Sequence, residues 1–127
     1  IRAISGYTDN ENPELITMQG IWSEITLYNS EKIQITSNTA IYNSINFDTQ
    51  FSNNVKIIYG NHKITCEKSD LIFSENLAKL YDNIIYENIY TKLFADKMEI
   101  NLVTKDSKVY MNDTNSKVKI IQKNGNN

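Results

Sequence analysis

The chain contains one histidine and one cysteine, His62 and Cys66, only four residues apart. A thiol beside an imidazole could act as a nucleophile or contribute to a zinc site. Zinc requires three or four ligands, and a nucleophilic pair requires a third group that orients its base, so the pair is incomplete for both purposes. Because His62 follows the turn residues Gly60 and Asn61, we expect it to be solvent-exposed. Cys66 falls within an apolar alternation and is expected to be a small core residue, so we predict no metal and no other cofactor.

Two pairs of acidic residues, Glu67 with Asp70 and Asp96 with Glu99, could support acid–base chemistry on a glycoside. Both pairs occupy the same place in successive copies of a sequence repeat of about thirty residues. A solvent-exposed corner of the chain at that place explains the acidic residues without catalysis. The sequence contains no P-loop and no motif of dinucleotide-binding proteins, serine hydrolases or zinc proteases. We therefore predict a protein that is not an enzyme.

Size and charge narrow the class of protein further. The chain has 127 residues and a formal net charge of -2, and its lysines and arginines are scattered singly. Nucleic acid is thus an unsuitable partner. The length fits one domain, which we place at residues 1–122, with residues 123–127 as a disordered polar tail. Since the chain begins at Ile1 without a methionine, we expect a signal peptide, an anchor or an expression boundary upstream.

A strand pattern recurs about every thirty residues. Three eleven-residue stretches, Lys32–Tyr42, Lys63–Phe73 and Lys92–Leu102, have apolar residues at their second, fourth, ninth and eleventh places. A unit of this size cannot bury its own apolar face, so neighbouring copies must stack. Between these stretches lies a second pattern, FSNNVKI at Phe51–Ile57 and LYDNIIY at Leu80–Tyr86. Each repeat is therefore expected to contain two strands.

The spacing within each stretch predicts a corner. Places two and four lie on one strand face, whereas places four and nine are five apart and would point to opposite faces. A bulge or corner at the polar residues Thr36–Thr39, Glu67–Asp70 and Asp96–Glu99 would return all of them to one inward face. The prediction is an all-β protein with two facing sheets, in which apolar side chains line the inside of a flattened roll. That lining is either an ordinary core or a groove that admits lipid chains.

Several segments resemble a known family. The stretches Ala95–Met111, Asn53–Ile57 and Ala3–Tyr7 resemble LptC, one of the OstA-like periplasmic proteins of lipopolysaccharide transport. The resemblance extends from Ile1 to about Ile121. LptA and the periplasmic domain of LptD share the same repeat. The sequence departs from the LptC pattern in two ways: residues 1–127 do not include the anchoring helix, which is expected upstream, and asparagine replaces most of the turn glycines.

The resemblance implies an OstA-like β-jellyroll, an open V-shaped roll of stacked antiparallel strands. It also implies that lipopolysaccharide acyl chains lie in the apolar groove, on the periplasmic side of the inner membrane. The lipid would arrive from an inner-membrane Lpt ABC transporter and pass to an LptA-like protein by edge-strand pairing. The residues expected to line the lipid groove are Ile33, Ile35, Val55, Ile57, Ile64, Leu71, Phe73, Ile84, Tyr86, Leu93, Ile100, Leu102 and Val109.

The expected docking edges are the terminal strands, at Ile1, Ala3, Val118 and Ile120. Two alternatives to an LptC-like role stay open. One is a soluble LptA-type bridge, which a signal peptide upstream would favour over an anchoring helix. The other is a structural β-solenoid with a closed core, which would have no slot between its sheet edges.

Overall fold

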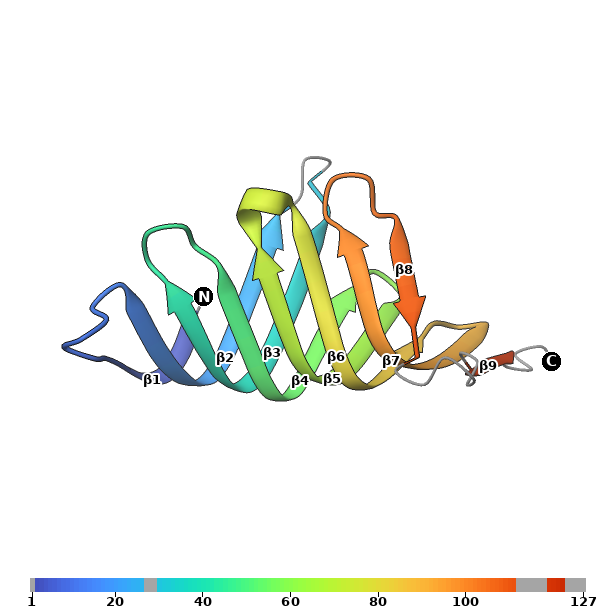
Figure 1. The fold of residues 1–127 in the computed structure, drawn as a ribbon. Helices are drawn as coiled ribbons and strands as arrows, with labels where there is room; N and C mark the ends of the chain where they lie inside the picture. Colours follow the sequence, from blue (N-terminus) through green and yellow to red (C-terminus); the bar gives the residue numbers. More distant parts are fainter. Residues whose placement is uncertain (1, 27–29, 112–118, 123–127) are drawn as a thin grey trace.

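A computed structural model of the protein describes residues 2–26, 30–111 and 119–122. The described residues form strands joined by short turns, with one 3-10 turn (Figure 1). The elements are β1 (Arg2–Thr8), β2 (Leu15–Thr26), β3 (Lys32–Asn43), β4 (Thr49–Tyr59), β5 (His62–Ile72), the 3-10 turn η1 (Phe73–Glu75), β6 (Leu77–Glu87), β7 (Thr91–Asn101), β8 (Ser107–Tyr110) and β9 (Lys119–Gln122). No helix in these ranges is long and apolar enough to cross a membrane.

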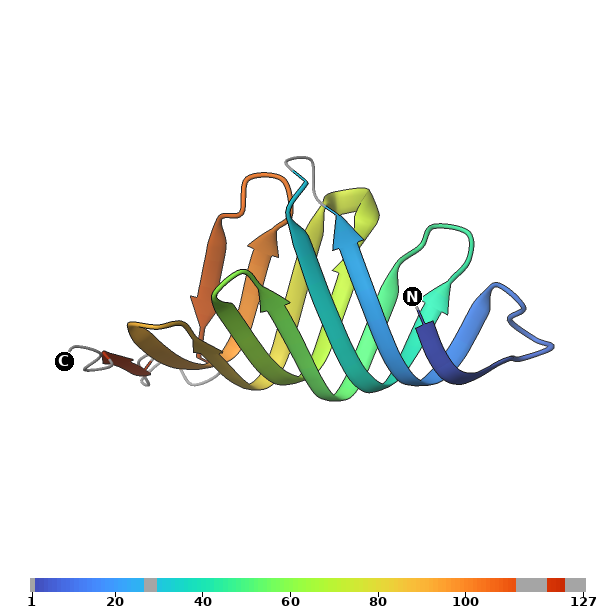
Figure 2. The same ribbon diagram turned by 180° about the vertical axis from the view of Figure 1, so that it is seen from behind.

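All nine strands found in the described ranges belong to one antiparallel sheet. Strands β1 to β8 follow one another in chain order across it, and β9 pairs with β7 beside β8. The long strands bend near their middle, so the sheet folds into a V seen from its two sides in Figures 1 and 2. The predicted all-β open roll is confirmed. Its two facing layers are the halves of one continuous sheet.

The two halves of the V are here called the first arm and the second arm. The first arm contains the β4–β5 and β6–β7 turns and β9, and the second contains the β3–β4 and β7–β8 turns, η1 and β8. In β3 the first arm ends near Thr36 and the second begins near Thr39, where the pairing with β4 shifts. Each long strand therefore contributes one half to each wall of the V.

The bend arises from an extra residue in β4 and in β6. Between Thr36 and Thr39 of β3 there are three steps, whereas the paired stretch of β4 from Ser52 to Lys56 has four. Asn53 and Asn54 absorb the extra residue with left-handed φ angles of 66° and 54°. In β6, Asp82 and Asn83 do the same at 64° and 52°. Asn and Asp tolerate this conformation better than other residues with a Cβ, which explains the recurring Asn/Asp-Asn pair.

In the strands that pair with these bulged strands, the alternation of inward and outward side chains shifts by one residue at the bend. The spacing of the repeat predicts this shift. In β3, Ile35 and Ala40 are both buried although they are five positions apart. The corner in β5 and β7 lies slightly earlier than expected. Ser69 and Met98 are already buried on the inward side, so the predicted corners at Glu67–Asp70 and Asp96–Glu99 extend too far toward the C-terminus. Acidic residues there lie in strands, not in turns.

The core occupies the base of the V, where the arms converge. Phe51, Ile35, Leu80, Ile84 and Val55 are its largest fully buried side chains. Each contributes roughly 1.5–3 kcal/mol by leaving water.

Cys66 is a buried free thiol of this core, as expected. Burial is the main cause that raises the pKa of its thiol to about 12, and the nearby carboxylates of Glu67 and Asp82 contribute to the rise. Because a thiol of this kind stays protonated at neutral pH, Cys66 serves packing and does not supply a nucleophile.

The sheet has an open edge at each end. β1 forms the N-terminal edge, and Ala3 lies in it opposite Ile21 of β2. At the other end, β8 covers the half of β7 in the second arm and β9 covers the half in the first arm, with Ile120 opposite Leu93. The other two expected docking residues, Ile1 and Val118, lie outside the described residues, as does the expected tail at 123–127.

A candidate lipid-binding cavity between the arms

The arms enclose a cavity of about 520 Å³ toward the C-terminal end of the V. Ligand pockets in proteins usually measure about 300–1,000 Å³. Side chains of both arms line the cavity: Ile33, Tyr59, His62, Ile64, Tyr86, Leu93, Met98, Ile100, Asn101, Leu102, Lys105, Ser107 and Val109. Most of these side chains are apolar, so the cavity suits an apolar ligand.

The predicted groove residues divide into those that line the cavity and those that form core. Position along the row of strands contributes to this division, because Ile57 and Ile64 pair directly and are both 7% exposed, yet only Ile64 lines the cavity. Seven of the predicted residues line the cavity: Ile33, Ile64, Tyr86, Leu93, Ile100, Leu102 and Val109. Five others are buried in the core and do not line it: Ile35, Val55, Ile57, Leu71 and Ile84. The remaining one, Phe73, begins η1 and packs half-buried against the core.

The cavity also has lining residues that the repeat pattern did not predict. Tyr59 and His62 could have been found by extending each inward alternation one step, from Val55 and Ile57 to Tyr59, and from Ile64 back to His62. Met98 follows from the phase change at the bend of β7. Asn101, Lys105 and Ser107 belong to the β7–β8 turn region and carry no periodic signal.

Aromatic and imidazole rings form the rim of the first arm. His62 is half-buried and stacks between Tyr59 and Tyr86, with ring centroids 5.9 and 5.7 Å away. Its Nδ1 also shares a hydrogen bond with the Tyr86 hydroxyl, which accepts a second one from the Asn88 side-chain amide at 3.1 Å. The expectation of a solvent-exposed His62 is therefore wrong. The residue begins β5 with its side chain on the inward face, under two tyrosines from neighbouring strands.

On the second arm, the β7–β8 turn holds Lys105 in a constrained conformation. The Asn101 side-chain oxygen accepts the backbone N–H groups of Val103 and Thr104, both at 2.9 Å. The N–H of Lys105 donates to the Asn101 carbonyl at 2.7 Å. Lys105 itself has a left-handed φ of 67°. This conformation disfavours a residue with a Cβ by roughly 1–2 kcal/mol, so the surrounding hydrogen bonds must hold the turn in place.

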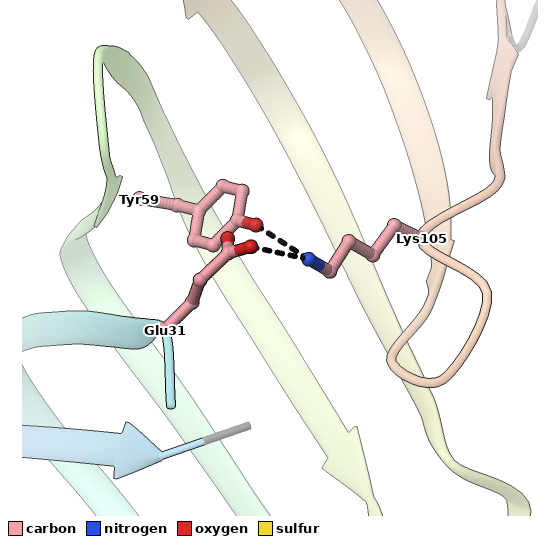
Figure 3. A network of polar contacts seen from close by, with 3 residues as sticks. All are labelled: Glu31, Tyr59 and Lys105. Carbon is pink, nitrogen blue, oxygen red and sulfur yellow. Dashed lines mark hydrogen bonds and ion pairs between the residues drawn. The ribbon is translucent and has the colours of Figure 1, made fainter. Parts of the chain in front are cut away.

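Lys105 connects the two arms across the mouth of the cavity (Figure 3). Its ammonium group donates to the Tyr59 hydroxyl at 2.7 Å and lies 3.0 Å from a carboxylate oxygen of Glu31, which precedes β3. Both charged side chains are about two-fifths exposed, at 38% and 43%. An ion pair so open to water contributes only about 0–1 kcal/mol. The bridge is therefore weak enough to exchange with another ion.

The acidic pairs do not form a catalytic arrangement. Glu67 is exposed, while Asp70 is half-buried beside Tyr81, whose pKa is raised by burial first and by the Asp70 carboxylate second. Glu99 lies 3.6 Å from the Lys97 ammonium. Within the described ranges, no three His, Cys, Asp or Glu side chains gather closely enough to hold a metal ion. The arrangement can therefore bind an apolar group and keep it from water, beneath the polar side chains at the rim of the cavity.

Comparison with known proteins gives a likeness of fold. No family model and no curated protein matches the sequence. Among solved structures, the fold is similar to LptH of Pseudomonas aeruginosa, the LptA-homologous periplasmic component of its lipopolysaccharide transport device, with a TM-score of 0.67. The match covers 94% of this chain and 91% of LptH at 9% sequence identity. At this identity the likeness establishes an LptA-like β-jellyroll and leaves function to the site.

Proposed function

We propose that this chain is a periplasmic module of lipopolysaccharide transport that shelters acyl chains in the cavity between its arms. The observation that carries the proposal is the apolar cavity itself, open at the mouth of a V-shaped sheet of the LptA type. The module performs no reaction. It lowers the free energy of an acyl chain that would otherwise meet water.

The hydrophobic effect determines how much free energy an acyl chain gains by leaving water. Each CH₂ group removed from water gains about 0.8 kcal/mol, so a chain of ordinary length gains roughly 10 kcal/mol if fully sheltered. A continuous apolar wall provides this gain without fixing the chain at one point. Movement along the wall then needs no chemistry, and an ATPase elsewhere in the system would supply the energy.

The open edges of the sheet fit a chain of modules. Unpaired edge strands normally invite aggregation, and natural proteins usually protect them. Here β1 has every described side chain exposed, with Ile4 88% exposed, and Ile120 of β9 is 62% exposed. We infer that these edges pair with an LptA-like protein by strand addition. In the finer assignment, the module is LptC-like and receives lipid beside an inner-membrane Lpt ABC transporter.

A soluble LptA-type bridge remains the second candidate, because the structural likeness is to an LptA homologue. End-to-end oligomers that grow with protein concentration would favour the bridge, whereas an uncleaved apolar helix upstream of the chain would favour LptC. The structural solenoid with a closed core is disfavoured by the cavity between the arms.

Photo-crosslinking tests the proposal. A photoreactive residue in place of Ile100, which lines the cavity, should capture lipopolysaccharide. The same residue in place of Ile58 is a matched control, since Ile58 is in β4 but lies on its exposed outer face. Capture from Ile58 with none from Ile100 would refute a lipid path between the arms.

A further inference from the structure

We propose that Lys105 and the Tyr59 hydroxyl form a binding site for the anionic head group of the amphiphile whose chain occupies the cavity. The inference rests on the proposed function and adds a polar end to the apolar site. It predicts that the cavity prefers chains with a negatively charged head over chains with a neutral one.

Charge placement is the first argument. Among the described residues that line the cavity, Lys105 is the only one with a permanent charge. The floor below it is formed by apolar side chains such as Ile64, Leu93 and Ile100. An amphiphile bound with its chain on this floor would leave its head group at the mouth, within reach of the Lys105 ammonium.

The Glu31 carboxylate supplies the second argument, because it shows that an anion fits beside Lys105. Its oxygen lies 3.0 Å from the ammonium, and Tyr59 stands next to both groups (Figure 3). A ligand carboxylate or phosphate placed there would meet the same cation. It could also accept a hydrogen bond from the Tyr59 hydroxyl. Since the Glu31–Lys105 pair is exposed and weak, an incoming anion can replace Glu31 at little cost.

The third argument is that Lys105 is held in position before any ligand arrives. Its backbone is fixed in a left-handed conformation by the Asn101-centred turn. Its Nζ also donates to the Tyr59 hydroxyl and lies 5.2 Å from the centre of the Tyr59 ring, which places the ammonium group at the first-arm rim. A preorganised cation loses less freedom on binding than a mobile one. The strained turn is thus consistent with a binding role for this side chain.

Displacement of the fluorescent apolar probe N-phenyl-1-naphthylamine measures head-group preference. The competitors are dodecyl phosphate, dodecanoate and the uncharged tetraethylene glycol monododecyl ether, which share one chain length. We expect the wild type to bind at least one anionic competitor about five- to tenfold more tightly than the ether. The stronger anion identifies the head group as phosphate or carboxylate.

Two substitutions with opposite expected effects sharpen the test. Lys105→Met removes the cation and should abolish the preference for the anion. Glu31→Gln removes the competing carboxylate and should strengthen anion binding by about two- to fivefold. Lys108→Met and Glu11→Gln make the same charge changes at exposed positions outside the cavity lining, and should leave the preference unchanged.

Equal affinity for all three competitors would overturn the head-group site while leaving the acyl-chain shelter intact. The head-group site would also be refuted if Lys105→Met and Glu31→Gln changed anion affinity in the same direction, as expected for a merely structural ion pair. Failure of every dodecyl compound to displace the probe would instead refute the proposed function itself.

Discussion

Replacing Ile84 with alanine should separate the core of the V from the wall of its cavity. Ile84 lies in β6 directly after the Asp82–Asn83 bulge, opposite Ala95 of β7, and its side chain is 0% exposed. Truncation removes buried carbon atoms at the base of the V. Both arms converge there, which hinders the surrounding side chains from moving in to fill the cavity left behind. Such substitutions cost about 2–5 kcal/mol, and we expect about 3–4 kcal/mol here. That is a large part of the roughly 5–15 kcal/mol that stabilises a typical domain.

Ile100→Ala is the matched control, because it makes the same chemical change on the cavity wall. Ile100 is only half-buried and faces space that is already unfilled, so fewer packing contacts are lost. We expect a loss of about 1 kcal/mol in unfolding free energy. Ligand binding should be weakened more by Ile100→Ala than by Ile84→Ala. We expect Ile100→Ala to weaken binding of a dodecyl chain by about three- to tenfold, because contacts between the wall and the chain are lost.

Urea unfolding followed by circular dichroism measures both stabilities. The midpoint should fall strongly for Ile84→Ala with an unchanged m-value. The melting temperature should drop by roughly 3–6 °C for each kcal/mol lost in a domain of this size. If Ile100→Ala destabilised the protein as much as Ile84→Ala, the separation of wall from core would be wrong.

Two further predictions concern Gly20 of β2 and the buried thiol. Gly20→Ala should lower the free energy of unfolding by about 1–3 kcal/mol, because Gly20 has φ +64° and an added Cβ would lie 2.5 Å from Ile4 Cδ1. Gly6→Ala is the control and should change stability by less than about 1 kcal/mol, because its Cβ would make ordinary contacts. Equal thermal shifts for the two variants would contradict this account of the Gly20 conformation and its contact with Ile4. Burial raises the pKa of Cys66 from 9.0 to about 12, so the folded state binds the thiol proton more tightly than the unfolded state. The stability that this difference contributes is complete below pH 9 and falls as the pH rises toward 12. Urea titrations across this range should show a steeper decline for the wild type than for Cys66→Ala, and parallel curves would contradict the shift.

Much of the fold follows from local sequence. The thirty-residue spacing and its apolar places predict stacked strands because side chains alternate strictly along an extended chain. The break in that alternation predicts a corner, and the structure confirms common burial of Ile35 and Ala40. The Asn53–Asn54 and Asp82–Asn83 pairs already mark the bend, since few residues with a Cβ accept left-handed angles. The sequence pattern shows that a bend must exist but not how the two halves remain joined in one sheet.

Which inward residues touch the cavity depends on the folded sheet and not on the local pattern. Val55 and Ile64 have equivalent places in the alternation, yet Val55 is core and Ile64 lines the cavity. The difference depends on the strand that each residue occupies and on its place along that strand, since Val55 pairs with Cys66, one inward place closer to the bend than Ile64. The inward direction of His62 follows from the alternation of β5, but its stacking between two tyrosines from neighbouring strands depends on the folded sheet.

The bridge at the mouth lies furthest beyond sequence reasoning. Lys105 is 74 residues from Glu31 and 46 from Tyr59, and none of the three belongs to a recognisable motif. Periodicity determined which side chains point inward, because that depends only on neighbours along one strand. Which of them face each other across open space depends on the closing angle of the arms and on one left-handed turn. Those are properties of the assembled sheet, and they alone place a single cation over an apolar floor.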